Sequence, residues 1–137
     1  MEIFNLSNDV TVFGVQVKEF PKGIGEAFEG LVKMLSSTDK RSYYGIFHMA
    51  ESGNMVYYAT AEQKRVGEAE KYNCDQLTIE KGKYLVETVL DWRGKTDTIK
   101  DIFEGMMQDA RVDNKKGGVE WYKNEKEMWC MLKMVQQ

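Results

Sequence analysis

The sequence contains the segment Ile24-Gly25-Glu26-Ala27-Phe28-Glu29-Gly30-Leu31-Val32, and Ile99-Lys100-Asp101-Ile102-Phe103-Glu104-Gly105-Met106-Met107 resembles it 75 residues later. In both segments apolar residues recur three and four positions apart, which is typical of one face of an α-helix. The same offset aligns residues 12–17 with 87–92 and residues 55–61 with 130–136. A repeat of about half the chain predicts two similar units packed together. Chance similarity between two amphipathic helices is the alternative.

The elements predicted around each helix follow the same order. In the first half, alternating apolar residues predict a strand before the helix and a hairpin after it. The second half repeats this order, with Thr96 or Asp97 as the expected N-cap of its helix. The predicted strands are residues 10–18, 43–49, 55–61, 77–91, 119–123 and 127–134, and a bend near residues 81–83 of the fourth is left open. Residues 63–76 are polar and are expected to link the halves.

These elements predict a single α+β domain made of two pseudo-symmetric β-α-β-β units, residues 10–62 and 85–137. The units have antiparallel sheets with the helices on one side. A ligand groove is expected between the halves, because clefts at such junctions often bind ligands. We expect this groove to lie on the sheet faces that the helices leave uncovered.

The composition fits a folded domain and narrows the classes of partner. The chain is 42% apolar, which argues against disorder, and its net charge of −3 argues against direct nucleic-acid binding. No signal-peptide pattern is found at the start, and no apolar run approaches the roughly 20 residues that span a bilayer. We therefore expect a cytoplasmic protein without membrane binding. Cys74 and Cys130 are expected to be free thiols, and the single histidine, His48, predicts neither a metal site nor a cofactor.

Strand alternation predicts which side chains line the groove, because successive residues of a strand point to opposite faces. On the last strand Cys130 and Leu132 are assigned to the helix side. Val119 and Trp121 are assigned to the same side, which leaves Glu120 facing the groove. Extending this assignment by the 75-residue offset gives a groove lined by Tyr43, Phe47, Tyr58, Tyr122, Trp129 and Met131 around Glu120, with Glu87 as a further candidate.

Aromatic walls around a carboxylate suit a hydrophobic cation or a planar molecule. Each ring can contribute cation–π attraction of roughly 0.5–2 kcal/mol, and the carboxylate supplies the opposite charge. The composition alone leaves another interpretation open. In that interpretation the rings are ordinary core residues and Glu120 is a solvated strand residue.

Three segments, in this order and spacing, carry a family resemblance that runs over about residues 8–135. Residues 43–47 with 55–59 look like the family's first hairpin. Residues 77–86 look like its "I-P-x-G-x-Y-x-V" strand, with Glu80 where proline is usual. Val119-Glu120-Trp121-Tyr122 looks like its "F-E-x-Y" signature, with Val119 replacing Phe. On these segments the chain resembles the GyrI-like effector-binding family, whose domains occur alone or behind DNA-binding heads in MerR- and AraC-type regulators.

The resemblance implies that Glu120 is the pocket carboxylate of a stand-alone small-molecule binding protein. The ligands implied are hydrophobic, cationic or planar, as in multidrug binding, and the role is linked to transcription regulation or to drug and toxin sensing. The connection at residues 90–95 departs from the family's small-residue turn, which places Trp92 at the rim of the groove. Because no helix-turn-helix head is found, a separate DNA-binding regulator or a homodimer is the expected assembly.

Two other functions stay open at this stage. Some GyrI-like proteins resemble hydrolases that open strained rings in planar natural products. In such an enzyme Glu120 would act as general base, and Tyr122 or Tyr58 would polarise the leaving oxygen. The remaining alternative is a protein-binding inhibitor that acts through an acidic surface and has no small ligand.

Overall fold

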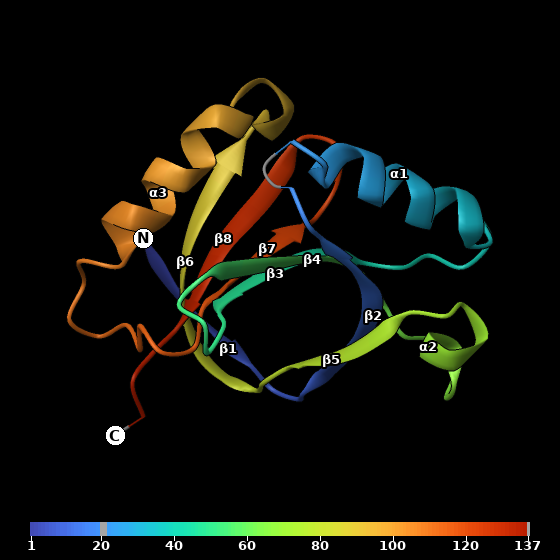
Figure 1. The fold of residues 1–137 in the computed structure, drawn as a ribbon. Helices are drawn as coiled ribbons and strands as arrows, with labels where there is room; N and C mark the ends of the chain where they lie inside the picture. The colour runs from blue at the N-terminus through green and yellow to red at the C-terminus, as the bar shows by residue number, and fades with distance from the viewer. Residues whose placement is uncertain (20–21, 137) are drawn as a thin grey trace.

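The computed structural model describes residues 1–19 and 22–136 and has the predicted α+β class (Figure 1). Its strands are β1 (Glu2–Leu6), β2 (Val10–Val17), β3 (Tyr43–Met49), β4 (Met55–Glu62), β5 (Asp75–Ile79), β6 (Gly82–Leu90), β7 (Gly118–Tyr122) and β8 (Glu127–Lys133). Its α-helices are α1 (Ile24–Met34), α2 (Glu68–Lys71) and α3 (Ile99–Met106). Two 3-10 turns, Trp92–Gly94 and Thr96–Thr98, precede α3. None of the helices in the described residues is both long and apolar enough to cross a bilayer.

One antiparallel sheet of eight strands, in the order β1-β6-β8-β7-β3-β4-β2-β5, organises the molecule. It curls strongly, and α1 and α3 lie on the same outer side of the curl (Figure 1). The units β2-α1-β3-β4 and β6-α3-β7-β8 meet where β3 pairs with β7. There Gly45 lies opposite Glu120, its own equivalent at the 75-residue offset. A pseudo-twofold axis therefore passes through this residue pair.

The strands at the two edges differ from the prediction. Residues 2–6 were not predicted as a strand, yet β1 pairs with β6, while β5 pairs with β2. The polar segment 63–76 contains α2 and the start of β5. The long strand predicted over 77–91 divides before Gly82, which has φ +129°, at the position where a bend was left open. β1, which directly precedes the first unit, thus pairs with the second, and β5, which directly precedes the second unit, pairs with the first.

The second helix is shorter than its apolar pattern predicts. It begins at Ile99 after Thr98, whose side chain makes no capping hydrogen bond, so the expected caps Thr96 and Asp97 are wrong. Beyond Met106, the Asp109 carboxylate accepts a hydrogen bond from the Arg111 backbone N–H at 2.9 Å. Such a local side-chain bond competes with helical bonding and favours a turn.

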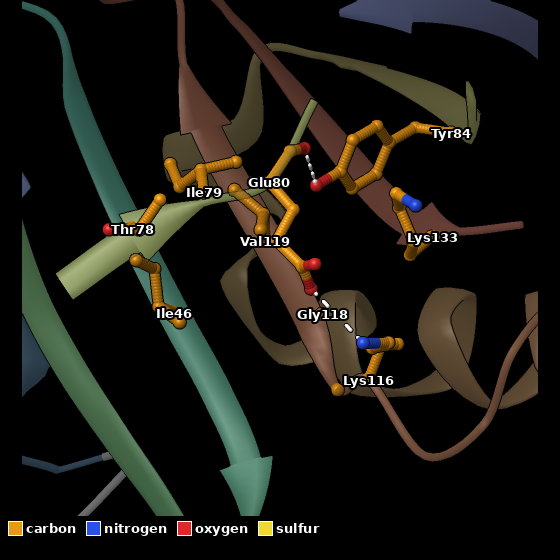
Figure 2. A pocket seen from close by; sticks show the side chains of 10 residues that line it. Ile46, Thr78, Ile79, Glu80, Tyr84, Lys116, Gly118, Val119 and Lys133 are labelled. Carbon is orange, nitrogen blue, oxygen red and sulfur yellow. Dashed lines mark hydrogen bonds and ion pairs between the residues drawn. The ribbon is translucent and has the colours of Figure 1, made fainter. Parts of the chain in front are cut away.

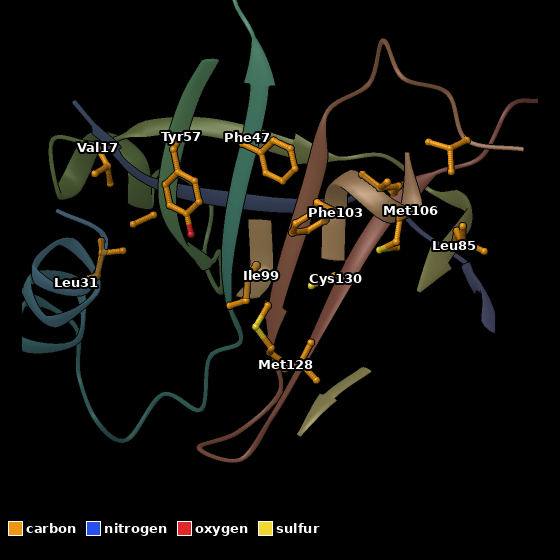
Figure 3. Close-up of a cluster of buried hydrophobic side chains, with 14 residues drawn as sticks. Val17, Leu31, Phe47, Tyr57, Leu85, Ile99, Phe103, Met106, Met128 and Cys130 are labelled. Atoms are coloured by element: carbon orange, nitrogen blue, oxygen red, sulfur yellow. The ribbon is translucent and has the colours of Figure 1, made fainter. Parts of the chain in front are cut away.

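Apolar side chains fill both faces of the sheet. The helix-side cluster is drawn in Figure 3 and includes Leu31, Phe47, Tyr57, Phe103, Met106, Met128, Cys130 and Leu132. On the inner face of the curl, the core is built from Val12, Tyr44, Tyr84, Val86, Val119 and Met131, with Phe4, Leu77, Trp121 and Trp129 packed against them. The helices cover the outer face of the sheet, and the curl of the sheet closes over its inner face. Both apolar faces are therefore packed.

A buried ion pair ties α2 to the connection between α1 and β3. The Arg41 guanidinium donates to both carboxylate oxygens of Glu68 at 2.9 and 2.5 Å, and the two side chains are 1% and 4% exposed. Arg41 also donates to Asp39, which Arg65 contacts from the solvent side. The Arg41 hydrogen bonds lower the pKa of Glu68 to about 2, against its burial. This network joins the connection before β3 to α2 by charged groups, beside the apolar cluster of Phe13, Leu35, Ala61 and Ala69.

Candidate functional site

Glu120 lies on the helix side of the sheet, contrary to the prediction. In the β7–β8 hairpin Glu120 pairs with Cys130 and Val119 pairs with Met131. Directly opposed residues of an antiparallel pair share a face, so Glu120 follows Cys130 to the helix side. Val119 and Trp121, which were assigned to that side, belong to the core of the inner face. The assignment slipped by one residue on β7, and such a slip exchanges the faces of a strand.

The sheet order places Glu120 between the two helices. Helix α1 packs on β4 and β2, whereas α3 packs on β8, and β7 and β3 are the strands between these. Glu120 is buried, with 7% of its surface exposed. The hydroxyls of Tyr57 and Tyr122 both donate to its Oε1 atom, that of Tyr122 at 2.7 Å. The carboxylate is thus held by two neutral phenols at the pseudo-twofold axis.

Gly45 makes room for this arrangement from the opposite strand. A Cβ atom at this position would overlap the Tyr57 hydroxyl and the Glu120 carboxylate. Glycine is therefore the residue that lets two polar side chains meet over the β3 backbone. Although Gly45 and Glu120 are equivalent by the repeat, only one half can supply a side chain here.

Aromatic rings from four different elements cover the carboxylate. The Tyr122 ring meets Phe28 of α1 edge-on at 5.2 Å and Trp92 of the turn after β6 at 4.9 Å. Tyr43 of β3 meets Phe28 at 6.5 Å. The four rings are all partly exposed. We call this set, together with Tyr57 and Glu120, the Glu120 cluster.

The helix contacts repeat across the axis. Phe28 and Phe103 are equivalent in the repeat, and so are Phe47 and Tyr122. Phe28 packs edge-on against Tyr122, and Phe103 packs edge-on against Phe47 at 4.8 Å. Each helix therefore rests an aromatic ring on the first strand after the helix of the other half. A movement of either helix would therefore displace an aromatic ring on β3 or β7, the two central strands.

Burial dominates the electrostatics of the site. It raises the pKa of the Glu120 carboxyl, although the hydrogen bonds from Tyr57 and Tyr122 lower it in part. The pKa values of Tyr57 and Tyr122 are raised well above the usual range, first by burial and then by the nearby carboxylate. Both phenols therefore stay protonated and can donate. The site holds a carboxyl group that is costly to ionise unless a positive charge arrives.

Several predicted site residues lie on the Glu120 face. Tyr43, Phe47 and Tyr122 do so by strand register, and Trp92 covers Tyr122 from the connection after β6. The further candidate Glu87 also shares this face, because it pairs with Cys130, and its carboxylate lies 3.5 Å from the N-terminal amine.

Three predicted residues lie on the opposite face. Tyr58 stacks on His48 at 6.2 Å, and Met131 is buried in the inner core. Trp129 forms a corner with Trp121, and the Lys123 ammonium lies 3.9 and 3.6 Å from these two ring centres. The prediction had placed these three residues on the sheet face away from the helices, where they lie. The error was to expect Glu120 and the groove on that face as well, because the slip on β7 exchanged the faces of that strand.

Tyr57, Phe28 and the role of Gly45 were not predicted from the sequence. Tyr57 pairs with Phe47 in the β3–β4 hairpin and so shares its face. Counting outward from the loop at residues 50–54 would have identified Tyr57 rather than Tyr58. Phe28 was predicted on the apolar face of the first helix. It was left out of the predicted site because the groove was expected on the side of the sheet away from the helices.

Two cavities lie away from the Glu120 cluster. One of about 230 Å³ runs beside α1 and is lined mainly by Val15, Leu31, Met34 and Tyr72. The other, of about 70 Å³, lies on the inner face near Lys133 (Figure 2). Neither is lined by Glu120. Among residues 1–19 and 22–136, no three His, Cys, Asp or Glu side chains gather as a metal site requires.

No family model matches the sequence, and no curated protein matches it either. Solved structures do match its fold. An integron cassette protein from the mobile metagenome of Vibrio cholerae superposes with a TM-score of 0.73 at 13% identity, covering 98% of this chain and 95% of that one. SAV2435, solved bound to tetraphenylphosphonium, gives 0.68 at 17% identity over 96% and 93% of the chains. A hydrolase from Listeria innocua gives 0.62 at 13% identity over 98% and 90%. The fold is thus consistent with that of GyrI-like proteins.

Proposed function

We propose that this chain is a GyrI-like small-molecule binding protein whose Glu120 cluster takes a hydrophobic cation. The observation that carries the proposal is the environment of the carboxylate. Glu120 is buried among aromatic rings, and none of the ion pairs found among the described residues includes it. Buried carboxylates are normally paired with a positive group, because leaving one unpaired is costly. A ligand cation would supply the missing partner.

The chemistry of the cluster favours a cation with spread charge. A compact ammonium is strongly hydrated and loses much on entering an apolar site. A phosphonium or a cationic dye carries its charge within an apolar shell, so its desolvation cost is lower and its shell can contact Phe28, Tyr43, Trp92 and Tyr122. Ring faces add cation–π attraction of about 0.5–2 kcal/mol each. The neighbour solved with tetraphenylphosphonium, which shares the fold, supports this ligand class.

A ligand can reach Glu120 only if the covering rings separate. Phe28, Trp92 and Tyr122 belong to α1, to a 3-10 turn and to β7, so they can part without breaking sheet hydrogen bonds. Trp92 is held by one hydrogen bond of 2.9 Å, from its indole N–H to the Asn124 carbonyl. We infer that ligand binding moves Trp92 and the Tyr122 ring and leaves Tyr57 on the carboxylate.

The proposal is tested by binding of tetraphenylphosphonium and of neutral triphenylphosphine oxide to three proteins. These are the wild type, Glu120→Gln and the control Glu104→Gln, whose side chain is exposed on α3. Loss of the charged partner should weaken the phosphonium by about 1–3 kcal/mol, which is roughly 5- to 150-fold, and spare the neutral compound. The control should bind both as the wild type does. Equal phosphonium affinity in all three proteins would refute the proposal.

Hydrolysis is the second candidate, and the raised pKa of Glu120 beside two phenols favours it. A general base works best when its pKa lies near the operating pH, and a protonated Tyr can polarise a leaving oxygen. The fold neighbour described as a hydrolase adds support at the level of the fold only. In this case Glu120→Gln would keep most of the binding and abolish turnover of a strained-ring planar substrate.

The biological setting of the proposal rests on the family resemblance. We propose a cytoplasmic binding protein that acts with a separate DNA-binding regulator or as a homodimer. Ligand binding at the Glu120 cluster would then change the level of transcription. The aromatic bridges from each helix to the other half would transmit ligand entry to the outer surface of α1 and α3.

A further inference from the structure

A second candidate site lies on the sheet face opposite Glu120. Here the turn between β5 and β6 approaches the start of β7 and the end of β8, and together they enclose the cavity of about 70 Å³ (Figure 2). Its polar lining comes from Thr78, Glu80, Lys116 and Lys133, and the ring of Tyr84 forms one wall. We call it the Lys133 cavity. From the sequence, Thr78, Glu80 and Tyr84 belong to the family strand, and Lys133 lies on the last strand on the side away from the helices.

Lys133 is an unusual lysine for this protein. It is 5% exposed, and its side chain points into the cavity beside Tyr84 (Figure 2). Its Nζ atom lies 5.9 Å from the Tyr84 ring centre. No ion pair or hydrogen bond joins this Nζ atom to any other residue that the structure describes. The residue as a whole is buried, and its ammonium faces the cavity with its donors available to a group that enters there.

The other charges around the cavity are already neutralised. Lys116 Nζ lies 3.2 Å from the Glu80 carboxylate, and the Tyr84 hydroxyl donates to the Glu80 carbonyl at 2.6 Å. These contacts leave the charge of Lys133 as the net charge of the lining. Lys116 is half-exposed, so its ammonium can turn from the Glu80 carboxylate toward an anion in the cavity without breaking buried contacts.

The backbone is shaped around the Lys133 side chain. Gly82 has φ +129°, and a Cβ atom there would lie 2.8 Å from Lys133 Cε and 2.9 Å from its Nζ. A residue with a side chain would therefore be strained at Gly82 and would push the ammonium away. The turn that carries Glu80 and Gly82 thus fits a buried lysine in this position.

We propose that the Lys133 cavity binds a small singly charged oxyanion, either a carboxylate or a phosphate monoanion. The three N–H groups of an ammonium match such oxygens, and the net charge of the lining equals one. The volume is several times the roughly 10–15 Å³ that one water requires, so a small anion fits. Glu80 disfavours a second negative charge on the ligand. The site is independent of the proposed function, because it lies on the other sheet face from Glu120.

The test is an NMR titration of the wild-type protein with sodium acetate and with sodium phosphate, against sodium chloride at equal ionic strength. Saturable shifts are expected at the amides of residues 79–82 and 116–118 with either oxyanion but not with chloride. Tighter acetate binding would identify a carboxylate ligand, and tighter phosphate binding would identify a phosphoryl group. Shifts that are equal for all three salts, or spread evenly over the surface, would overturn the proposal.

Two lysine variants sharpen the result. Lys133→Met keeps the length of the side chain and removes the charge, so the oxyanion affinity should fall at least about tenfold. Lys115→Met removes an exposed charge outside the cavity and should leave the affinity unchanged. Unchanged affinity in Lys133→Met would contradict the assignment. If that variant fails to fold, the wild-type titration alone decides.

Discussion

Two equivalent residues at the pseudo-twofold axis have different chemistry, and this difference creates the site. Glu120 projects over the centre of the sheet, and Gly45 leaves the space that its carboxylate and the Tyr57 hydroxyl occupy. A symmetric pair of carboxylates at this distance would repel each other in a buried setting. The duplicated fold thus supplies a symmetric frame in which one half holds the charge and the other half makes room for it.

Glu120 should make the folded protein less stable as the pH rises. Its folded-state pKa is raised by burial, so the folded state holds a proton that the unfolded state releases above about pH 4.5. Stability should therefore fall between that pH and the folded-state pKa, by about 1.4 kcal/mol for each pH unit in this window. Glu120→Gln removes this dependence. Urea unfolding at several pH values should show a gain for Glu120→Gln that grows with pH, and a gain that is constant across pH would count against a buried ionisable carboxyl.

Glu68 should show the opposite pH dependence. Its pKa is lowered to about 2 by Arg41, so its contribution is complete above about pH 4.5 and is lost as the pH falls toward 2. Removing one partner of a buried ion pair costs about 3–5 kcal/mol, so Glu68→Gln should lose roughly that at pH 7. The difference from the wild type should shrink below pH 4.5. The exposed glutamate variant Glu70→Gln is the matched control on α2 and should change stability little.

At the scale of elements, the two helices are equivalent in sequence but not in burial. Phe103 of α3 is 4% exposed within the helix-side cluster, whereas its equivalent Phe28 of α1 is only partly buried and belongs to the Glu120 cluster. The α3 contact is therefore mainly structural, and the α1 contact also covers the candidate site.

Truncating these two phenylalanines should separate the two roles. Phe103→Ala should cost about 3–5 kcal/mol of unfolding free energy, the usual range for a buried Phe. Phe28→Ala should cost clearly less, since its ring is partly exposed, and should weaken tetraphenylphosphonium binding. Chemical denaturation measures the first effect and calorimetric titration the second. Equal costs for both variants would mean that α1 and α3 pack alike, contrary to the different exposure of the two rings.

At the scale of the whole molecule, much of the fold follows from local patterns. The 3.6-residue period predicts helices α1 and α3, and two-residue alternation predicts six of the strands in the right order, because apolar periodicity is local information. The edge strand β1 was missed, since its five residues are stabilised by pairing with β6 rather than by their own pattern. The curl that joins β1 and β5 to the opposite units depends on long-range pairing, which no local window contains.

The candidate site was predicted in part, for a related reason. The motif 119–122 pointed to Glu120 and Tyr122, but the face of a strand depends on register. The groove was predicted on the sheet face that the helices leave uncovered. That choice selected Tyr58 instead of Tyr57 and added Trp129 and Met131 to the predicted site. Counting pairs outward from the two hairpin loops would have corrected all three, because opposed residues share a face.

The central claim is that a hydrophobic cation binds beside Glu120, and the position of a heavy cation tests it most directly. Crystals grown with tetraphenylarsonium would give an anomalous peak for arsenic. We predict one strong peak on the helix side of the sheet, within about 6 Å of the rings of Tyr122 and Trp92, the range for cation–π contact, and its loss in Glu120→Gln. A peak at the corner of Trp121 and Trp129, or in the cavity beside α1, with none near Glu120, would contradict the account.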